Sequence, residues 1–264
     1  MNELLQVMTR LRDPETGCSW DRAQDFRSLI PYLLEESYEV VDVLEQRDID
    51  PVALRDELGD LLFQVVFHSR IAEECGWFDF SAVAAGMTEK LIRRHPHVFE
   101  DADMEHDPAR WDAIKARERA VAGKPAGVLA GVPNALPALM RADKLGHRAA
   151  RVGFDWQAVS DVLAKVREEL DEVEDALAAR EPMARIEEEL GDVLFAVAQL
   201  ARFLDLNAES ALRRANTKFI ERFSWIERQL AADGLHPEPI HLARMEALWE
   251  RAKRMGDEDA ADAD

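Results

Sequence analysis

The strongest constraint on the fold of this chain is an acidic helical pattern. In the stretch 165–192, Glu169 and Glu172 lie three residues apart. After a short break that contains a proline, Glu189 and Asp192 repeat this spacing. At helical pitch, a spacing of three places both side chains on one face of a helix. Two such helices packed antiparallel would therefore direct four carboxylates toward one place.

The same acidic pattern occurs earlier in the chain. Glu36 and Glu39 are followed by Glu57 and Asp60, after an interval similar to that of the later copy. In each copy, the second pair of acids lies in a closely similar segment, which reads ELGDLLF in the first copy and ELGDVLF in the second. We interpret the two copies as an internal duplication rather than a short-period repeat.

Basic and aromatic residues are duplicated in the same order. Lys90 and Arg94, four residues apart, correspond to Lys218 and Arg222. Trp111 and Lys115 likewise correspond to Trp249 and Lys253. Structural repetition alone would explain recurring Leu and Phe, but it does not require recurring charges opposite the core. The duplicated charges therefore indicate a functional site.

The chain is expected to fold into an all-α protein. Apolar residues recur at helical spacing, and the run 61–67, which a buried strand could also explain, belongs to a pattern too long for a strand. Gly and Pro concentrate in 123–137, which we interpret as a linker. We expect an N-terminal repeat over 1–122 and a C-terminal repeat over 138–264.

The acids suggest a metal site. Four carboxylates cannot all stay ionised in one place unless a cation holds them, and Mg²⁺ or Mn²⁺ prefers such oxygen ligands. A solvated acidic face is the alternative for a single copy.

Metal, Lys and Arg together suit the binding of a polyphosphate, and Trp249 would either stack on a base or pack in the core. The chain has no GxxxxGK[ST] loop and no GxSxG motif, so direct attack by a metal-activated water is the simplest chemistry.

Several motifs resemble the MazG family of all-α nucleoside triphosphate pyrophosphohydrolases. They are EExxE followed by ExxD, together with GCSWD, RRHPHVF, LPALMRA and VGFDW, and they extend over nearly the whole chain. The resemblance implies the two-repeat bacterial form, with a four-helix core in each repeat, and a homodimer. It also implies Mg²⁺-dependent cleavage between the α- and β-phosphates, which yields a nucleoside monophosphate and diphosphate.

The resemblance also assigns roles to residues of the second repeat. The implied metal ligands are Glu169, Glu172, Glu189 and Asp192. The implied substrate contacts are Lys165, Glu168, Arg185, Lys218, Arg222, Trp249 and Lys253. The resemblance does not settle which carboxylate takes the proton from water. Our own expectation is Glu168 or Glu169, so the expected catalytic set is Glu168 and the four metal ligands.

We expect the second repeat to carry most of the catalysis. Aligning the acids places Tyr32 opposite Lys165 and Ala53 opposite Arg185, so the first repeat lacks two cations. Neighbouring arginines could replace them. A possible second site in the first repeat comprises Glu36, Glu39, Glu57, Asp60, Lys90 and Arg94.

Three alternatives remain open at this point. The first is a narrower pyrophosphatase that acts on dUTP or a damaged nucleotide. The second is a di-iron bundle, which needs Glu-x-x-His on facing helices, whereas this spacing occurs only at Glu238 and His241, around a proline. The third is a non-catalytic helical scaffold.

Charge and hydropathy limit the partners and the location. A net charge of −20 argues against a nucleic-acid partner. No apolar run approaches the roughly 18 residues of a membrane helix, and the two cysteines suit a reducing compartment. We therefore expect a cytoplasmic protein with no membrane partner.

The apolar runs at 61–67 and 193–204 are larger than one face of a helical bundle needs, which favours a homodimer.

Overall fold

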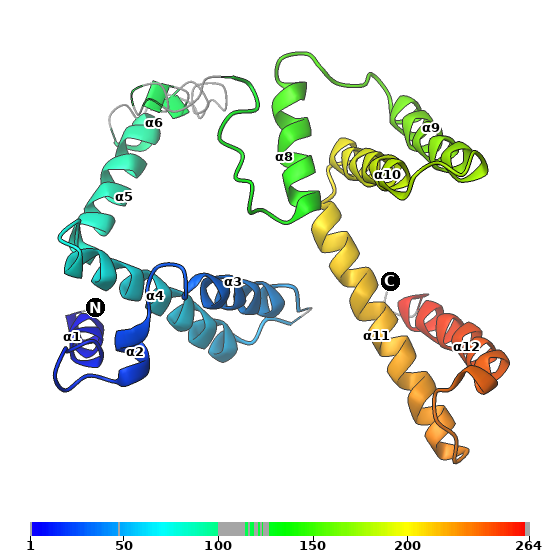
Figure 1. The fold of residues 1–264 in the computed structure, drawn as a ribbon, viewed down its shortest axis with the longest axis horizontal. Helices are drawn as coiled ribbons and strands as arrows, with labels where there is room; N and C mark the ends of the chain where they lie inside the picture. Colours follow the sequence, from blue (N-terminus) through cyan, green and yellow to red (C-terminus); the bar gives the residue numbers. More distant parts are fainter. Residues whose placement is uncertain are drawn as a thin grey trace. The chain divides into compact units, whose positions relative to one another are not determined.

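The computed structural model describes residues 2–46, 48–99, 114, 115, 117, 118, 121, 123 and 127–261, with side chains up to Met255. These residues form helices joined by turns and loops, and no strand occurs among them (Figure 1). The predicted all-α fold is confirmed. The chain divides into two compact units, Met1–Ala116 and Arg117–Asp264.

The first unit is built around a helical hairpin. Its described helices are α1 (Asn2–Leu11), α2 (Ser19–Ala23), α3 (Ile30–Leu44), α4 (Pro51–Glu74), α5 (Phe80–Arg94) and α6 (Pro96–Phe99). Helix α3 packs against α4, and α1 and α5 also contact α4. Asp50 caps α4 by accepting a hydrogen bond from the Val52 amide at 2.8 Å. The core contains Met8, Leu29, Val66, Phe67 and Ile71.

The second unit contains two helical hairpins. Its described elements are α8 (Ala138–Ala150), α9 (Val159–Ala178), α10 (Met183–Phe203), α11 (Ala208–Ala232), the 3₁₀ helix η1 (Pro239–His241) and α12 (Leu242–Ala261). Helix α9 packs against α10, which also contacts α8, whereas α12 packs against α11 (Figure 1). The α11–α12 pair has its own core of Ile226, Leu230 and Leu248. The acids and the later basic residues therefore lie on different hairpins.

Part of the predicted linker is held against α8. Arg141 donates a hydrogen bond to the Asn134 side chain at 3.0 Å, and Arg148 donates to the Ala130 carbonyl. The predicted repeat boundaries stay a prediction. Trp111, which the sequence pairs with Lys115, lies outside the described residues.

A buried polar network fastens α8 to α10. Gln199 is 1% exposed and donates to the Ala142 carbonyl at 2.8 Å. Arg202 donates to Gln199 Oε1 at 2.8 Å and to Asp155 at 3.1 Å. Gly146 on α8 makes room for these side chains, because a Cβ there would overlap with Gln199. The network fixes the segment that leads into α9.

The Asp155–Arg202 pair predicts a specific pH dependence. Hydrogen bonds from Arg202 hold the pKa of Asp155 below its usual value. A carboxyl whose pKa is depressed by folding stabilises the protein above its unfolded pKa of about 3.9, and this contribution is lost as the pH falls through the folded pKa. We expect Asp155→Asn to be less stable than wild type near neutral pH, with a difference that shrinks as the pH is lowered through the acid range. Urea unfolding at several pH values measures this, and a pH-independent difference would contradict it.

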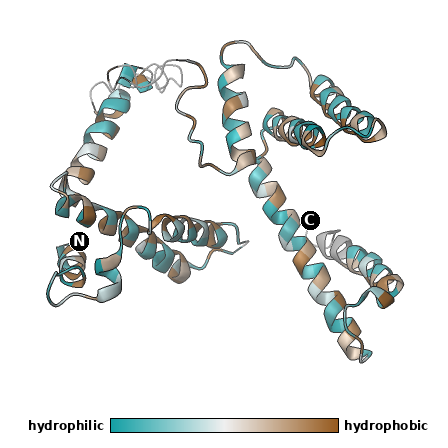
Figure 2. Ribbon diagram, in the orientation of Figure 1, coloured by the Kyte–Doolittle hydropathy of each residue, from teal (hydrophilic) through white to brown (hydrophobic). Residues whose placement is uncertain are grey.

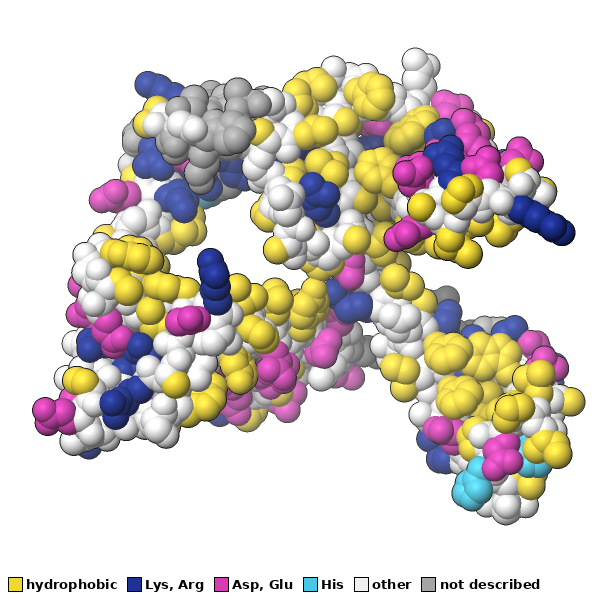
Figure 3. Space-filling model, in the orientation of Figure 1, with side chains coloured by type: hydrophobic (Ala, Val, Ile, Leu, Met, Phe, Trp, Pro, Cys, Tyr) yellow, Lys and Arg dark blue, Asp and Glu magenta, His cyan; other side chains and the backbone are white. Residues whose placement is uncertain are grey.

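The surfaces of both units carry many apolar side chains. Hydrophobic and hydrophilic residues alternate around the helices in Figure 2, and Figure 3 shows hydrophobic side chains grouped over α11 and α12. Phe219 is 55% exposed and Leu194 on α10 is 52% exposed. No helix among the described residues is both long enough and apolar enough to cross a membrane.

Candidate metal and phosphate site

The α9–α10 hairpin brings three of the predicted acids together. Glu169, Glu189 and Asp192 each offer a carboxylate oxygen, and these oxygens lie within 4.8 Å of one another. Glu169 and Glu189 are buried, at 6% and 4% exposure, whereas Asp192 is exposed. Buried carboxylates are costly unless a cation or hydrogen bonds compensate them. The cluster therefore needs positive charge.

Two cations from the same hairpin provide part of that charge. Lys165 Nζ lies 2.8 Å from both Glu168 and Glu169, one turn away on α9. Hydrogen bonds to Glu168 and then Glu169 raise the pKa of Lys165, so it stays protonated at neutral pH. The sequence predicted Lys165 as a phosphate ligand, and the structure places it against the acids.

Arg185 plays the same part on α10. Its guanidinium is paired with Glu188 at 3.0 Å and with the buried Glu189. The hydrogen bond to Glu188, followed by the charge of Glu189, raises the pKa of Arg185. Each buried acid of the cluster thus has one basic partner on its own helix.

Glu172 borders the cluster without belonging to its three closest acids. It is half-buried, and its pKa is raised first by burial and then by the charges of Glu169 and Glu189. The influence of Glu169 and Glu189 shows that Glu172 lies near both acids, although it is not one of the three whose oxygens lie within 4.8 Å of one another.

The remaining predicted substrate contacts lie on the α11–α12 pair. Arg222 stacks over the Trp249 ring at 5.8 Å, and Lys253 pairs with Glu250 at 2.8 Å. Trp249 also packs against the core of this pair and lies 5.3 Å from Phe219. Within the described residues, no hydrogen bond, ion pair or ring contact joins these side chains or Lys218 to the acids of α9 and α10.

The first unit has a corresponding acidic cluster on α3 and α4. Glu36, Glu39 and Glu57 offer carboxylate oxygens within 4.8 Å of one another. Burial, then the charge of Asp60, raises the pKa of Glu36, and burial, then the charge of Glu39, raises that of Glu57. Three of the four duplicated acids are thus grouped in each unit, with Asp60 left out of the first group and Glu172 out of the second.

The two clusters differ in their surroundings. Tyr32 takes the position of Lys165 and packs edge-on against Trp20, with ring centroids 5.6 Å apart. Ala53 takes the position of Arg185. In the described part of the first unit, no ion pair reaches the three clustered acids. Lys90 and Arg94 lie on α5, which follows the hairpin.

Sequence reasoning missed Gln64, a polar neighbour of the first cluster. Its Nε2 donates to Glu36 Oε1 at 3.5 Å. Gln64 follows Asp60 by four residues and Glu57 by seven, so helical spacing places all three on one face of α4. This spacing was visible in the sequence.

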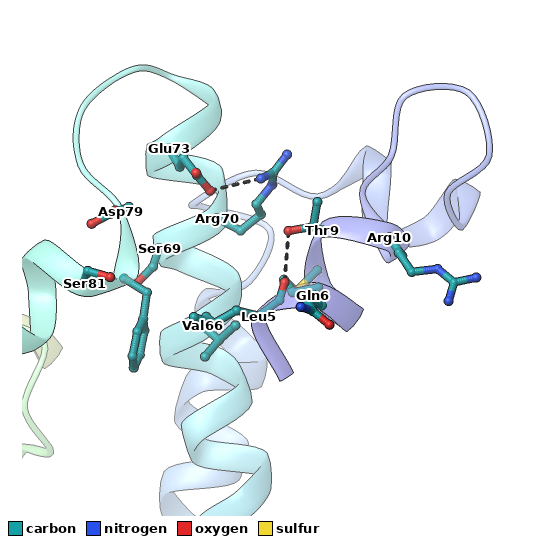
Figure 4. Close-up of a pocket in the computed structure, with 12 residues that line it drawn as sticks. Leu5, Gln6, Thr9, Arg10, Val66, Ser69, Arg70, Glu73, Asp79 and Ser81 are labelled. Carbon is teal, nitrogen blue, oxygen red and sulfur yellow. Dashed lines mark hydrogen bonds and ion pairs between the residues drawn. The ribbon is translucent and has the colours of Figure 1, made fainter. Parts of the chain in front are cut away.

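A separate cavity of about 460 Å³ lies in the first unit between α1, α4 and the start of α5 (Figure 4). Leu5 and Val66 line it, and the ion pair of Arg70 with Glu73, at 3.0 Å, borders it. None of the predicted site residues lines this cavity. It is therefore distinct from both acidic clusters.

Comparison with known proteins identifies the duplicated segments. The family model described as "MazG nucleotide pyrophosphohydrolase domain" matches residues 24–99 and 157–226. A nucleoside triphosphate pyrophosphohydrolase of Escherichia coli K12 is 49% identical over 258 residues, which cover 96% of this chain and 97% of the relative. A Thermotoga maritima protein named nucleoside triphosphate pyrophosphohydrolase/pyrophosphatase MazG is 44% identical over 257 residues, 97% of this chain and 96% of its own. A Mycobacterium tuberculosis nucleoside triphosphate pyrophosphohydrolase is 32% identical over 233 residues, 87% of this chain and 58% of its own.

Proposed function

Because this chain belongs to the MazG nucleotide pyrophosphohydrolase family, we propose that it hydrolyses nucleoside triphosphates to nucleoside monophosphates and diphosphate. The observation that carries this proposal is the α9–α10 cluster, where buried acids and two cations meet inside a segment that matches the family model. The full-length relatives named for this activity support it. We assign the reaction to the second unit.

The donor set of the cluster fits a divalent metal ion. All its ligating atoms are carboxylate oxygens, two of them from buried residues, which suits Mg²⁺ or Mn²⁺. The residues that would hold the ion are Glu169, Glu172, Glu189 and Asp192. When bound, such an ion neutralises charge on phosphate oxygens and lowers the pKa of a coordinated water.

The cations of the hairpin would bind the triphosphate. Lys165 and Arg185 each pair with one exposed acid, Glu168 and Glu188 respectively, in addition to the buried acid of the cluster. Phosphate oxygens could therefore replace these exposed carboxylates at little cost, and Arg185 can form two parallel hydrogen bonds to a phosphate. Glu168, released in this exchange, or Glu169 would accept the proton of the attacking water.

We propose that the chain forms a homodimer in which the substrate-binding residues of α11 and α12 serve the acidic cluster of the other copy. Lys218, Arg222, Trp249 and Lys253 suit a nucleotide but pack on a hairpin of their own. A second copy of the chain could present its α11–α12 pair to the α9–α10 acids. It could also cover exposed apolar residues such as Leu194 and Phe219.

Light scattering tests the dimer. We expect a mass twice the 29.9 kDa of the chain at micromolar concentration. Leu194→Asp should shift the mass toward the monomer, since a dimer interface would bury the new charge. The matched control is Ile240→Asp at an 82% exposed position of η1, which should remain dimeric. A monomeric wild type would contradict the assignment.

Product analysis tests the reaction. Each common nucleoside triphosphate and deoxynucleoside triphosphate is incubated with the protein, with and without Mg²⁺, and the products are separated by ion exchange. We expect metal-dependent formation of the monophosphate and diphosphate, because cleavage lies between the α- and β-phosphates. A nucleoside diphosphate with orthophosphate would contradict the proposal. Turnover of dUTP or a damaged nucleotide alone would favour the narrower enzyme, and no turnover would favour a scaffold.

A further inference from the structure

The two units differ at the cavity between α1, α4 and the start of α5 (Figure 4). Val66, Ser69 and Phe80 line this cavity in the first unit. Alignment of the acids and of the basic pairs relates positions 66, 69 and 80 to positions 198, 201 and 208 of the second unit. All three of those positions are alanines that pack with α8, namely Ala198, Ala201 and Ala208. Small side chains thus allow close helix contact in the second unit, whereas larger ones border an open space in the first.

The apolar part of the cavity wall is the edge of a packed core. Met8 and Val66 are each 1% exposed and belong to the core of the first unit, and Leu5 and Phe80 pack against that core. The volume of about 460 Å³ falls within the roughly 300–1,000 Å³ that is typical of small-molecule sites. The wall therefore suits a small molecule with an apolar body.

Two hydroxyl groups of the wall have already used their protons. Thr9 Oγ1 donates to the Leu5 carbonyl at 2.9 Å (Figure 4). Ser69 Oγ donates to the Val65 carbonyl at 2.7 Å. A hydroxyl has one proton and two lone pairs, so each of these oxygens can only accept a further hydrogen bond. These groups favour a ligand that donates.

The charges at the wall favour a cation. Arg70 is paired with Glu73 at 3.0 Å on its own helix, and Figure 4 shows Arg10 directed away from the other lining side chains. Asp79 has no ion pair in the part of the chain that the structure describes, and its Oδ1 accepts from the Ala82 amide at 2.7 Å. The Asp79 carboxylate is therefore the charge at this wall that a ligand can neutralise.

The charge of Asp79 is not needed for its capping role. Asp79 is the N-cap of α5, and Asn207 is the N-cap of α11 at the equivalent position of the second unit. Asn207 accepts from the Ser210 amide at 3.0 Å, and Asn and Asp are about equally good caps. The carboxylate is thus specific to the unit that has the cavity.

We propose that this cavity binds a small organic cation, namely a primary amine on an apolar body. The apolar body packs against Leu5, Val66 and Phe80. The ammonium group, which carries three donors and no acceptor, donates to the Asp79 carboxylate and to a hydroxyl oxygen of the wall. The site is separate from both acidic clusters.

Nuclear magnetic resonance on the full chain with isotope-labelled methionine methyl groups tests the proposal, with phenethylamine as the probe. The Met8 resonance is assigned from its loss in Met8→Leu. We expect phenethylamine to shift this resonance saturably, and neutral phenethyl alcohol to bind at least about tenfold more weakly. Equal shifts at all methionine resonances, no shift at Met8, or equal binding of the alcohol would overturn the proposal.

Substitution of Asp79 tests the charged contact. Asp79→Asn keeps the cap, so its helix content should match wild type, but its preference for the amine over the alcohol should disappear. Asp50→Asn is the matched control, because Asp50 caps α4 and does not line the cavity. It should keep the preference. A preference that persists in Asp79→Asn, or that is lost in Asp50→Asn, contradicts the assignment. Because the titration contains no nucleotide, its result is independent of the proposed hydrolysis.

Discussion

The double substitution Glu169→Gln/Glu172→Gln is expected to abolish nucleoside triphosphate hydrolysis, whereas Glu36→Gln/Glu39→Gln should retain most of it. The first variant loses the buried carboxylate of Glu169, which belongs to the cluster and pairs with Lys165, and the carboxylate of Glu172, which borders the cluster. A catalytic metal ion contributes several kcal/mol to transition-state stabilisation. Its loss should therefore reduce kcat/KM by about a thousandfold or more.

The variant Glu36→Gln/Glu39→Gln tests whether the first unit contributes less to turnover than the second. Tyr32 and Ala53 stand where the second unit has Lys165 and Arg185. Each missing charge-assisted phosphate contact costs on the order of 1.5–3 kcal/mol, or about one to two decades in rate or affinity. The first unit should accordingly contribute little to turnover, even though three of its four acids are grouped.

This difference is measured by steady-state kinetics on both double variants at saturating Mg²⁺. Both variants should first be shown to have equal helix content. The two variants change the same residue types at matched positions, so each serves as the control for the other. Activity that survives in Glu169→Gln/Glu172→Gln and disappears in Glu36→Gln/Glu39→Gln would place catalysis in the first unit. Equal partial losses would indicate two active sites.

Gly146→Ala is expected to destabilise the protein by about 1–5 kcal/mol, although alanine is the better helix former. An added Cβ would overlap with Gln199 Oε1 and lie 2.8 Å from Arg202 Nε. Gln199 cannot move aside freely, because it is buried and donates to the Ala142 carbonyl. Overpacking costs about 1–3 kcal/mol, and a hydrogen bond lost from a buried group adds about 1–3 kcal/mol, against about 1 kcal/mol gained in helix propensity.

The same substitution at Gly86 provides the control. Gly86 lies within α5, and a Cβ there would meet no atom within 4 Å. Gly86→Ala should therefore leave the free energy of unfolding unchanged or raise it by up to about 1 kcal/mol. Chemical denaturation of both variants gives the comparison. Equal effects at the two positions would show that the α8–α10 contact is less tightly packed than the structure indicates.

The helices and the acid pairs could be predicted from the sequence because both depend on local geometry. Helix α5 spans Phe80–Arg94 and ends two residues before Pro96, because the residue that precedes a proline disfavours the helical conformation. A spacing of three in Glu169 and Glu172, or in Glu57 and Asp60, sets one helix face whatever the helix packs against. The duplication predicted the same arrangement twice. Three of the four acids are grouped in each unit, but Asp60 is left out of the first group and Glu172, which is not its counterpart, is left out of the second.

The partners of the charged side chains could not be predicted in this way. Lys165 and Arg185 were expected to meet phosphate, and the structure pairs each of them with a buried acid four residues along its own helix. A spacing of four residues allows a basic side chain to pair with an acid on its own helix, but it does not determine whether the basic side chain binds that acid or a ligand. The selection depends on how far the packed hairpin removes the acids from water, because desolvation strengthens the demand for a counterion.

The sequence by itself determined the all-α fold, the duplication and the helix faces that carry the acid pairs, because helical pitch relates residues that are close along the chain. Only the tertiary structure decided that α11 and α12 form a separate hairpin and that Gly146 makes room for Gln199. It also decided that the Gln64 oxygen is buried with no hydrogen-bond partner in the part of the chain that the structure describes. These features depend on contacts between residues far apart in the chain. Their energies come from close packing and desolvation, which no local spacing encodes.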